Sequence, residues 1–462
     1  INLVGVQALG LGLGTLIHEM GVAPRIAVGH DFRSYSASIK QALIIGLMEA
    51  GCEVHDIGLA LSPVAYFSQF ELDVPCVAMV TASHNENGWT GVKMGAQRPL
   101  TFGPDEMSRL KEIVLGGDGK ARDGGRYIRV ADMAERYIAD LTDRPKVKRK
   151  LRVVAACGNG TAGAFAPKVL EGIGVEVIPL DCELDWTFPR YNPNPEDMEM
   201  LHALRDKVLE TGADVGLGFD GDGDRCGVVD DEGEEIFADK VGVMLARDIS
   251  GLHKDAKFVV DVKSTGLFVT DPVLKENGAT TTYWKTGHSY IKRYSHENKA
   301  LVGFEKSGHF FFNPPLGRGY DDGFVAALAV CDMLDRNPDK SMADLLDALP
   351  KTWQSPTMSP HCDDEAKYAV VDKVVEHYKK IAEDGGTIAG QKIREVITVN
   401  GIRVVLADGT WGLVRASSNK PELVVVVESP TSEANMKAIF SDIDKQLSQF
   451  SEVGEYNQKL AV

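Results

Sequence analysis

The feature that most constrains the fold is a run of three aspartates at alternate positions, Asp220, Asp222 and Asp224, spaced by glycines. It follows the apolar-rich run 213–217, which predicts a buried strand. Glycine allows the tight backbone turns that bring three carboxylates to one point. Carboxylates held that close repel one another unless a cation lies between them, and oxygen ligands with room for another anion suit Mg²⁺. The stretch therefore predicts a divalent metal site at the end of a strand.

Three other interpretations of this loop compete with the metal site. An isolated Asp-Gly-Asp is commonly a solvated turn. An EF-hand loop needs glycine at its sixth position and a helix before it, whereas this chain has Arg225 there and a predicted strand before it. A strand-borne Asp-x-Asp also occurs in phosphatases with an aspartyl nucleophile. The third aspartate and the flanking arginine fit a metal cage better.

The composition is that of an ordinary globular chain. Its 462 residues, 44% hydrophobic and 25% charged, are enough for about three or four domains. The net charge of −17 argues against nucleic acid or an anionic membrane as a partner. Seven scattered cysteines do not make a disulfide framework in a chain of this length, so we expect reduced thiols, a cytoplasmic location and Cys226 in the core.

The sequence contains no apolar run long enough to span a membrane. It opens with Ile1 and has neither a basic start nor a cleavage pattern, so we expect no signal peptide. Because no methionine stands at position 1, we expect residues to be missing upstream.

Strands and helices alternate over the first part of the chain. Helical spacing covers residues 2–20, although three glycines oppose it, and residues 39–50, while apolar runs predict strands at 25–29, 54–57 and 75–80. This alternation predicts α/β layers with functional loops at the carboxyl ends of the strands. Similar strand–glycine openings at 152–160 and 257–266 indicate three related α/β units, and the basic stretch 144–150 predicts a linker.

The pattern changes near residue 351. A helix is predicted over 365–382, followed by strands at 395–399, 403–406, 412–415 and 423–427 with turns at 400–401 and 408–409. These indicate a small α+β domain with an antiparallel sheet. A last helix presents one apolar face, formed by Met436, Ile439, Phe440, Ile443 and Leu447. We place the domains at 1–145, 146–247, 248–350 and 351–462.

A serine and a lysine follow the strand predicted at 75–80. Ser83 could be a turn or helix-cap residue, or else a nucleophile or phosphate carrier, although the Gly-x-Ser-x-Gly pattern of a hydrolase is absent. Lys93 lies between Gly91 and Gly95, which predicts a close-packed loop rather than a surface position. A nearby cation would make this lysine less basic, so that it could exchange protons with a hydroxyl.

Further polar loops occur in the later domains. Glu305 and Ser307, at alternate positions after a predicted strand, could bind adjacent sugar hydroxyls, whereas His309 alone would more often be structural. The stretch around His288 is a similar polar loop, but it indicates a binding site less strongly. Between two strands of the last domain lies either a phosphate-binding turn or a hairpin with a stray arginine, comprising Arg415, Ser417, Ser418 and Asn419.

Taken in this order and spacing, the four motifs resemble the α-D-phosphohexomutase superfamily, and most closely its bacterial phosphomannomutase/phosphoglucomutase group. The resemblance covers essentially the whole chain. It implies three related mixed α/β domains and a mobile C-terminal α+β domain around a central cleft. It also implies an isomerase that interconverts hexose 6-phosphate and hexose 1-phosphate, of mannose and/or glucose, through a phosphoserine and glucose 1,6-bisphosphate or mannose 1,6-bisphosphate.

The resemblance also assigns roles to residues. Ser83 would carry the phosphoryl group, and together with the three aspartates of the loop it would hold Mg²⁺. Lys93 would be the general acid/base, and Arg225 would neutralise the transferring phosphoryl group. Glu305 and Ser307 would bind the 3- and 4-hydroxyls of the sugar. His309 would be a catalytic residue and would line the cleft with His288 and Lys263. The phosphate that does not react would be held by Arg415, Ser417, Ser418 and Asn419.

The sequence departs from the family pattern at three points. Glu86 stands where a proline is usual after Ser-His-Asn, which adds a negative charge near the phosphoserine. Lys306 occupies the variable middle of the Glu-x-Ser-Gly-His loop. The family's amino-terminal segment, which supplies a tyrosine and an arginine to the cleft, is not in this sequence.

Other functions stay open beside the mannose/glucose mutase. They are a phosphoglucosamine mutase, an aspartyl-nucleophile phosphatase and a non-catalytic sugar-phosphate sensor. A sensor has no need of Ser83, Lys93 and three aspartates together. The expected partner is a phosphosugar, and the protein is expected to be a monomer or a weak homodimer.

Overall fold

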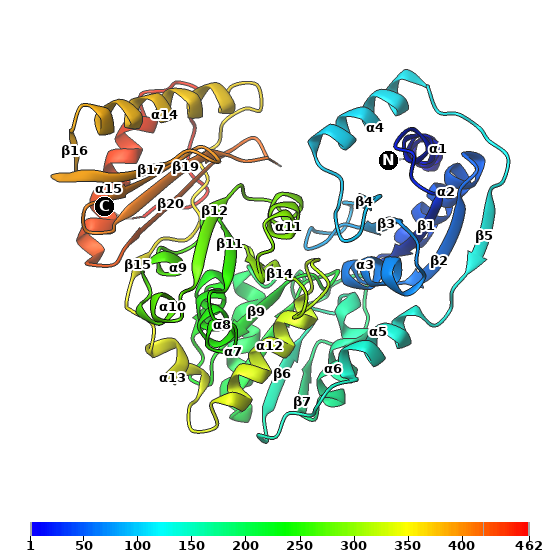
Figure 1. Ribbon diagram of the computed structural model, residues 1–462, viewed down its shortest axis with the longest axis horizontal. Coiled ribbons are helices and arrows are strands. Elements are labelled where there is room, and N and C mark those ends of the chain that lie inside the picture. The colour runs from blue at the N-terminus through cyan, green and yellow to red at the C-terminus, as the bar shows by residue number, and fades with distance from the viewer. Residues whose placement is uncertain (1, 419, 461–462) are drawn as a thin grey trace. The chain divides into compact units, whose positions relative to one another are not determined.

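The computed structural model describes residues 2–418 and 420–460. The chain forms two compact units, Ile1–Asp248 with His288–Leu346 and Ile249–Gly287 with Asp347–Val462. Figure 1 labels their helices and strands. The four domain boundaries expected from the sequence stay a prediction.

A five-stranded sheet in the order β4-β3-β1-β2-β5 organises the first part of the first unit (Figure 1). Its neighbouring strands are parallel, except that β4 runs antiparallel to β3. The sheet is therefore the mixed α/β layer that the alternating pattern predicts. Its strands are β1 (Arg25–His30), β2 (Glu53–Leu59), β3 (Cys76–Thr81), β4 (Gly91–Gly95) and β5 (Arg126–Arg129).

Helices lie on both faces of this sheet. Ile26 and Val28 of β1 belong to one core cluster with α1, α2 and α4, while α3 packs on β1 and β3 outside that cluster. The predicted helix 39–50 begins earlier, at Ser36, because its polar first turn has no apolar periodicity to reveal it. The helices of this part are α1 (Leu3–Glu19), α2 (Ser36–Glu49), α3 (Ser62–Glu71), α4 (Pro104–Gly116) and α5 (Met133–Thr142).

The glycines that weaken α1 as an isolated helix are required where it packs on α2. A Cβ atom on Gly10 would lie 2.3 Å from the carbonyl oxygen of Leu43, and one on Gly46 would lie 2.0 Å from that of Gln7. Both distances are too short for any side chain. The low helix propensity of glycine, about 1 kcal/mol per residue, is thus overridden by a close helix–helix contact.

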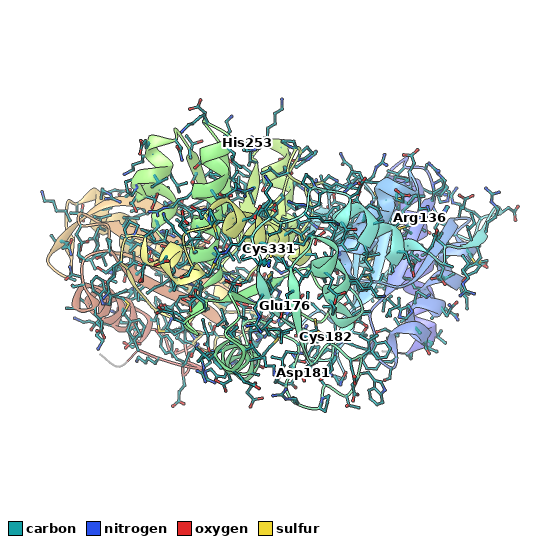
Figure 2. The ribbon with its side chains drawn as sticks, turned by 90° about the horizontal axis from the view of Figure 1, so that it is seen from below. Arg136, Glu176, Asp181, Cys182, His253 and Cys331 are labelled. Carbon is teal, nitrogen blue, oxygen red and sulfur yellow. The ribbon has the colours of Figure 1, made fainter. Side chains whose placement is uncertain are left out.

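In a second five-stranded sheet, β10-β9-β8-β6-β7, the four strands β9-β8-β6-β7 repeat the order β4-β3-β1-β2 of the first, and the fifth strand lies at the opposite edge. β6 pairs parallel with β7 and β8, and β9 returns antiparallel beside β8. The strands β6 to β9 therefore correspond to β1 to β4, as the repeated openings predict. Figure 2 shows β7 between Glu176 and the adjoining Asp181. The elements are β6 (Arg152–Ala156), α6 (Ala166–Gly172), β7 (Glu176–Leu180), α7 (Met198–Thr211), β8 (Val215–Phe219), β9 (Cys226–Val229), β10 (Glu235–Ile236) and α8 (Ala238–Leu252).

The remaining elements of the first unit include an antiparallel pair, β13 and β14. In each of the pairs β3–β4, β8–β9 and β13–β14, a chain segment with candidate site residues joins two antiparallel neighbours. This shared connection is the structural form of the repeat. The elements are α11 (His288–Glu297), β13 (Val302–Phe304), β14 (Phe310–Phe312), α12 (Gly323–Arg336) and α13 (Met342–Asp347).

The second unit contains a parallel pair, β11 (Lys257–Asp261) and β12 (Thr280–Trp284), and a six-stranded sheet in the order β15-β20-β19-β18-β17-β16. Every pairing in that sheet is antiparallel, as predicted. The other elements are α9 (Leu267–Thr270), α10 (Pro272–Glu276), β15 (Trp353–Gln354), α14 (Lys367–Glu383), β16 (Thr387–Ile388), β17 (Gln391–Ile397), β18 (Ile402–Leu406), β19 (Trp411–Ala416), β20 (Leu423–Ser429) and α15 (Glu433–Leu447).

The core of the second unit lies between its six-stranded sheet and helices α14 and α15. All five apolar residues predicted for one face of the last helix are buried there, which confirms that prediction. On the other side of the sheet, the fully buried Arg403 donates hydrogen bonds to the carbonyls of Val262 (2.8 Å) and Ser264 (2.6 Å). Its guanidinium also lies over the rings of Tyr283 and Trp411.

Candidate active site

The three aspartates predicted as metal ligands follow β8 and are all fully buried. One carboxylate oxygen from each lies within 4.8 Å of the others. Among the described residues, Asp222 Oδ1 and Asp224 Oδ1 have no hydrogen-bond donor. Buried carboxylate oxygens that lack donors fit a cation, so the loop has the donor set of a magnesium site. Asp222 is also fixed from α3, where Ser62 Oγ donates to its Oδ2 at 2.5 Å.

Two cations lie against these carboxylates. Lys93 Nζ is 2.7 Å from Asp222 Oδ2 and also contacts Asp224, while Arg225 Nε is 3.3 Å from Asp220 Oδ2. Burial and the charges of Asp224 and Asp222 raise the pKa of Asp220 well above its usual value. Burial also raises the pKa of Asp222, but Lys93 outweighs it and holds that pKa below its usual value.

The prediction that Lys93 lies in a loop was wrong, whereas its lower basicity beside a bound cation stays a prediction. The residue lies in strand β4, where it pairs with Met79 of β3, and not in a loop, because glycines at both ends of a short edge strand resemble a turn in sequence. Burial lowers the pKa of Lys93, but the carboxylates of Asp222 and Asp224 more than compensate, so the pKa lies well above its ordinary value. The residue is largely buried, with 16% of its side chain exposed, as predicted.

Ser83 reaches the same carboxylates from the β3–β4 connection. Its Oγ lies 3.3 Å from Asp220 Oδ2 and 3.5 Å from Arg225 Nη2. Its backbone has a φ of 52°, the left-handed region that costs a non-glycine residue about 1 kcal/mol or more. Ser83 lies in a turn that Asn85 N closes by donating to the carbonyl of Ala82 at 3.0 Å, which confirms the turn interpretation. A strained, partly exposed serine at this position is also suited to carrying a phosphoryl group. The neighbouring Glu86 is exposed.

The strained serine loop is held by two residues that sequence reasoning did not assign to the site. Arg33 Nη2 donates to the carbonyls of Ser83 (3.0 Å) and Asn85 (2.6 Å). Asp31 Oδ2 accepts from Arg33 Nε at 3.3 Å and from Thr81 Oγ1 at 2.9 Å. Asp31 directly follows β1 and Arg33 lies two residues further on, so the signal available was their place at the carboxyl end of a strand next to β3.

Arg225 is placed by partners on several sides. Its Nη1 donates to Glu196 Oε2 at 3.0 Å, and its Nη2 donates to His84 Nδ1. Burial and then the Arg225 charge lower the pKa of His84 to about 3, so this imidazole is neutral and can accept that bond. His84 is thus a second functional neighbour of Ser83 that the sequence did not identify.

A second cluster surrounds Asp321, which is fully buried. Lys292 Nζ lies 2.7 Å from Asp321 Oδ1 as an ion pair, and Asp321 Oδ2 is 3.2 Å from His309 Nδ1 and 3.8 Å from His288 Nδ1. His309 Nδ1 is also 3.6 Å from Asp224 Oδ1, so this cluster joins the aspartate loop. Burial lowers the pKa of His309, but the charges of Asp224 and Asp321 outweigh burial, so this pKa lies above its usual value. Burial lowers the pKa of His288 to about 3.

Glu305 and Ser307 lie in the turn between β13 and β14 and not on a strand, so the alternate-position argument for their direction was wrong. The turn closes through Gly308 N donating to the carbonyl of Glu305 at 3.0 Å. An isolated antiparallel bridge between Arg225 and His309 then joins this turn to the aspartate loop. Glu305 is buried and Ser307 is half-buried.

The other predicted site residues belong to the second unit. Lys263 is buried, with its Nζ 3.9 Å from Asp261 Oδ2. The predicted phosphate turn joins β19 to β20, and Arg415 lies at the end of β19. Ser417 Oγ accepts from Lys420 N at 3.3 Å, and Ser418 is exposed. Asn419 lies outside the described residues.

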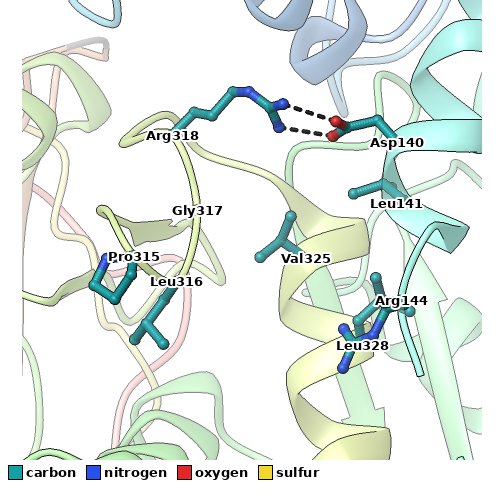
Figure 3. Close-up of a pocket in the computed structure, with 9 residues that line it drawn as sticks. All are labelled: Asp140, Leu141, Arg144, Pro315, Leu316, Gly317, Arg318, Val325 and Leu328. Atoms are coloured by element: carbon teal, nitrogen blue, oxygen red, sulfur yellow. Dashed lines mark hydrogen bonds and ion pairs between the residues drawn. The ribbon is translucent and has the colours of Figure 1, made fainter. Parts of the chain in front are cut away.

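A separate cavity of about 380 Å³ in the first unit contains none of the predicted site residues (Figure 3). Arg318 and Asp140 form a two-bond ion pair at its rim, each bond 2.7 Å long, and Arg144 pairs with Asp332. Both arginines are therefore already neutralised by carboxylates, which makes the cavity a poor site for a phosphate. The lining is completed by Leu141, Pro315, Leu316, Gly317, Val325 and Leu328.

Comparison with known proteins identifies the family. Four models of the phosphoglucomutase/phosphomannomutase family match in chain order, namely α/β/α domains I (1–120), II (135–233) and III (237–353) and the C-terminal domain (361–446). A phosphomannomutase/phosphoglucomutase of Pseudomonas putida is 34% identical, over 94% of this chain and 88% of that protein. The chain belongs to the phosphoglucomutase/phosphomannomutase family. Its members are isomerases that act as phosphotransferases.

Two further members of the phosphoglucomutase/phosphomannomutase family support this result. A phosphoglucomutase of Neisseria gonorrhoeae is 33% identical, over 92% of this chain and 89% of that protein. The crystal structure of a family protein from Burkholderia thailandensis matches with a TM-score of 0.85 and 28% identity, over 97% of this chain and 94% of that chain. Among the described residues, no helix is long and apolar enough to cross a membrane.

Proposed function

We propose that this chain interconverts hexose 6-phosphate and hexose 1-phosphate, with mannose and/or glucose as the sugar. The observation that carries the proposal is the placement of Ser83 Oγ 3.3 Å from one of three buried, clustered aspartates, with Lys93 bound to the other two. Mannose and glucose differ at the 2-hydroxyl, which the proposed Glu305 and Ser307 contacts leave untouched, so both sugars are expected.

Ser83 is the proposed phosphoserine. In the first transfer its Oγ–P bond breaks and the phosphorus bonds to a hydroxyl oxygen of the sugar monophosphate, which yields glucose or mannose 1,6-bisphosphate. In the second transfer the other phosphate returns to Ser83 Oγ and leaves the isomeric monophosphate. Arg225, with Nη2 at 3.5 Å from that Oγ, neutralises charge on the moving group.

Lys93 is the proposed relay of the proton from the sugar hydroxyl to Ser83 Oγ. The ammonium gives a proton to Oγ as the phosphoryl group leaves and regains one from the hydroxyl, so its charge is the same after each transfer. The three aspartates are the proposed Mg²⁺ ligands, and the ion when bound supplies positive charge against the phosphoryl oxygens. His309, fixed between Asp224 and Asp321, is positioned to hold a proton near the reacting oxygens.

The proposed sugar ligands in the first unit are Glu305 and Ser307, with His288 as a neutral donor or acceptor. In the second unit Lys263 is proposed to bind substrate, and the phosphate ligands are Arg415, Ser417, Ser418 and the predicted Asn419. We further expect a monomer or weak homodimer. The free thiols of all seven cysteines are in keeping with the cytoplasmic location proposed from the sequence.

The test is isomerisation of mannose 1-phosphate and of glucose 1-phosphate by the full chain, with Mg²⁺ and a trace of glucose 1,6-bisphosphate. Ser83→Ala is run beside it, and mass spectrometry records the phosphorylation of Ser83. We expect turnover of both sugars and none in the variant. Turnover that survives in Ser83→Ala would point to an aspartyl nucleophile instead.

Inactivity towards both sugars, in folded and phosphorylated protein, would overturn the mannose/glucose assignment. Glucosamine phosphates are then the next substrates, because a probable phosphoglucosamine mutase of Methanothermobacter thermautotrophicus is 29% identical over 90% of this chain. Binding without turnover of any of these sugars would indicate a sensor.

A further inference from the structure

Two thiols lie side by side at one end of the second sheet. Cys182 Sγ is 3.6 Å from Cys157 Sγ. Cys157 directly follows β6 and is fully buried, whereas Cys182 lies two residues beyond β7 and is partly exposed. Figure 2 labels Cys182 beside Asp181. The separation exceeds a disulfide bond of about 2.05 Å by roughly 1.5 Å, which side-chain rotation and a small backbone shift can close.

The sheet itself keeps the two sulfurs together. β6 and β7 pair in parallel up to Ala156 and Leu180, and Cys157 N then donates to the carbonyl of Leu180 at 3.1 Å. Cys182 Sγ also lies 3.2 Å from the carbonyl oxygen of Ala155. The proximity of the thiols is therefore a property of the strand register and not of a mobile loop.

A peroxide-reactive pair needs one accessible, acidic thiol and a second thiol beside it, and the two thiols differ in these properties. Burial raises the pKa of Cys157 well above its usual value, whereas a hydrogen bond with Cys157 lowers that of Cys182. Cys182 is therefore both the more acidic and the more accessible thiol, and the thiolate is the form that reacts with oxidants. Cys157, held next to it, is placed as the resolving thiol.

We propose that Cys157 and Cys182 form a dithiol site that hydrogen peroxide oxidises reversibly to a disulfide. The Cys182 thiolate attacks one peroxide oxygen, the O–O bond breaks, and a sulfenic acid and hydroxide form, the hydroxide taking up a proton to become water. Cys157 sulfur then bonds to the sulfenic sulfur, and the hydroxyl leaves as a second water with the thiol proton. Two thiols and one peroxide thus give one disulfide and two waters.

The disulfide would act on the segment that carries Ser83. The loop that starts at Cys182 reaches this segment twice, through Asn87 Nδ2 donating to the carbonyl of Trp186 at 2.7 Å and through Asn192 Nδ2 donating to the carbonyl of His84. Drawing Cys182 towards Cys157 therefore moves the base of the loop on which residues 83–89 rest. We infer that oxidation loosens this segment.

The experiment treats the full, reduced chain with hydrogen peroxide, blocks remaining thiols with N-ethylmaleimide and digests with trypsin. Cleavage at Lys168 separates residues 153–168, which contain Cys157, from residues 169–190, which contain Cys182. We expect these two peptides to be joined until a reductant is added, and alkylatable thiols to fall by two, from seven to five. Cys182→Ser and Cys157→Ser should each abolish the joined peptide, whereas Cys331→Ser, which removes another buried thiol, should leave it intact.

Amide hydrogen exchange over residues 83–89 is measured on the reduced and the oxidised wild type. Faster exchange in the oxidised protein, reversed by reductant, supports the coupling to the serine loop, and unchanged exchange would overturn it. Recovery of the two peptides singly, both alkylated, after peroxide treatment of the folded wild type would overturn the dithiol site itself. Neither readout uses catalysis, so the outcome is independent of the proposed mutase function.

Discussion

Lys93 places its positive charge against two of the carboxylates that a dication would bind, so removing this charge should strengthen metal binding. Its ammonium is 2.7 Å from Asp222 Oδ2 and also contacts Asp224, and both aspartates are fully buried. Replacing Lys93 with glutamine keeps the side-chain length close to that of lysine and removes the charge. The variant should therefore bind Mg²⁺ more tightly than the wild type while losing mutase activity.

The magnitude follows from Coulomb's law. Two unit charges 4 Å apart interact by about 4 kcal/mol at an effective dielectric constant near 20, and Lys93 faces two carboxylates. Because a flexible lysine can turn aside when a dication arrives, only part of this energy opposes the metal. We expect about 1.4 to 2.8 kcal/mol, which corresponds to a dissociation constant for Mg²⁺ roughly 10- to 100-fold lower in Lys93→Gln.

The assay is calorimetric titration of metal-stripped protein with Mg²⁺, on wild type and variant in the same phosphorylation state of Ser83. Lys40→Gln is the matched control, because Lys40 forms a similarly buried pair, 2.5 Å from Asp56 Oδ1, away from the aspartate loop. Its affinity for Mg²⁺ should equal that of the wild type. Equal or weaker Mg²⁺ binding by a folded Lys93→Gln would refute the view that the ammonium competes with the metal.

Three further predictions concern supporting residues. Arg33→Lys loses two carbonyl hydrogen bonds of 3.0 and 2.6 Å that hold the strained Ser83 loop, so kcat/KM should fall at least about tenfold in the mutase assay. Arg403→Lys loses bonds to two buried carbonyls of the second unit, so the free energy of unfolding in urea should fall by about 3 kcal/mol. Burial raises the pKa of Asp408, but hydrogen bonds from Thr431 and its other donors outweigh burial and lower that pKa from 3.8 to about 2. The charge of Asp408 therefore stabilises the fold above pH 3.8, and this contribution is lost as pH falls towards 2. Because water screens this partly exposed charge, Asp408→Asn should cost about 1 kcal/mol at pH 7 and less at pH 3, by urea unfolding.

Each of these three predictions has an outcome that would contradict it. Unchanged kcat/KM in Arg33→Lys would mean that the loop keeps its shape without the guanidinium. A stability loss below about 1 kcal/mol for Arg403→Lys would mean that the lysine ammonium replaces both carbonyl bonds. A cost of Asp408→Asn that is the same at both pH values would show that the side chain acts through its shape and not its charge.

Many of the strands and a few of the helices could be predicted from the sequence because their signals are local. Alternating apolar runs, the glycine after each opening strand and the Asn400-Gly401 turn belong to adjacent residues, and the structure confirms the strands that they mark. The aspartate loop could also be predicted from adjacent residues, since three carboxylates within five residues, spaced by glycines, can turn towards one cation. Even the repeat was visible, as a similar strand opening that recurs three times.

Lys93 and the Glu305 turn show where local reasoning failed. A lysine between two glycines resembles a loop, but the hydrogen bonds of β3 turn the stretch into an edge strand. Its basicity depends on Asp222 and Asp224, which are 129 and 131 residues away in the chain. No window of sequence contains both partners, so the direction of the pKa shift was set by the tertiary structure.

The sequence by itself predicted which residues carry the chemistry and which strands precede them. Only the tertiary structure decided which of them meet. It added Arg33, Asp321 and Lys292, to which the sequence assigned no role, and it placed His84 of the Ser-His-Asn motif against Arg225. The physical reason is that a motif consists of residues adjacent in the chain, whereas the charges around a residue belong to groups that the fold brings within a few ångströms. The thiols of Cys157 and Cys182, 25 residues apart and 3.6 Å from each other, illustrate the same rule.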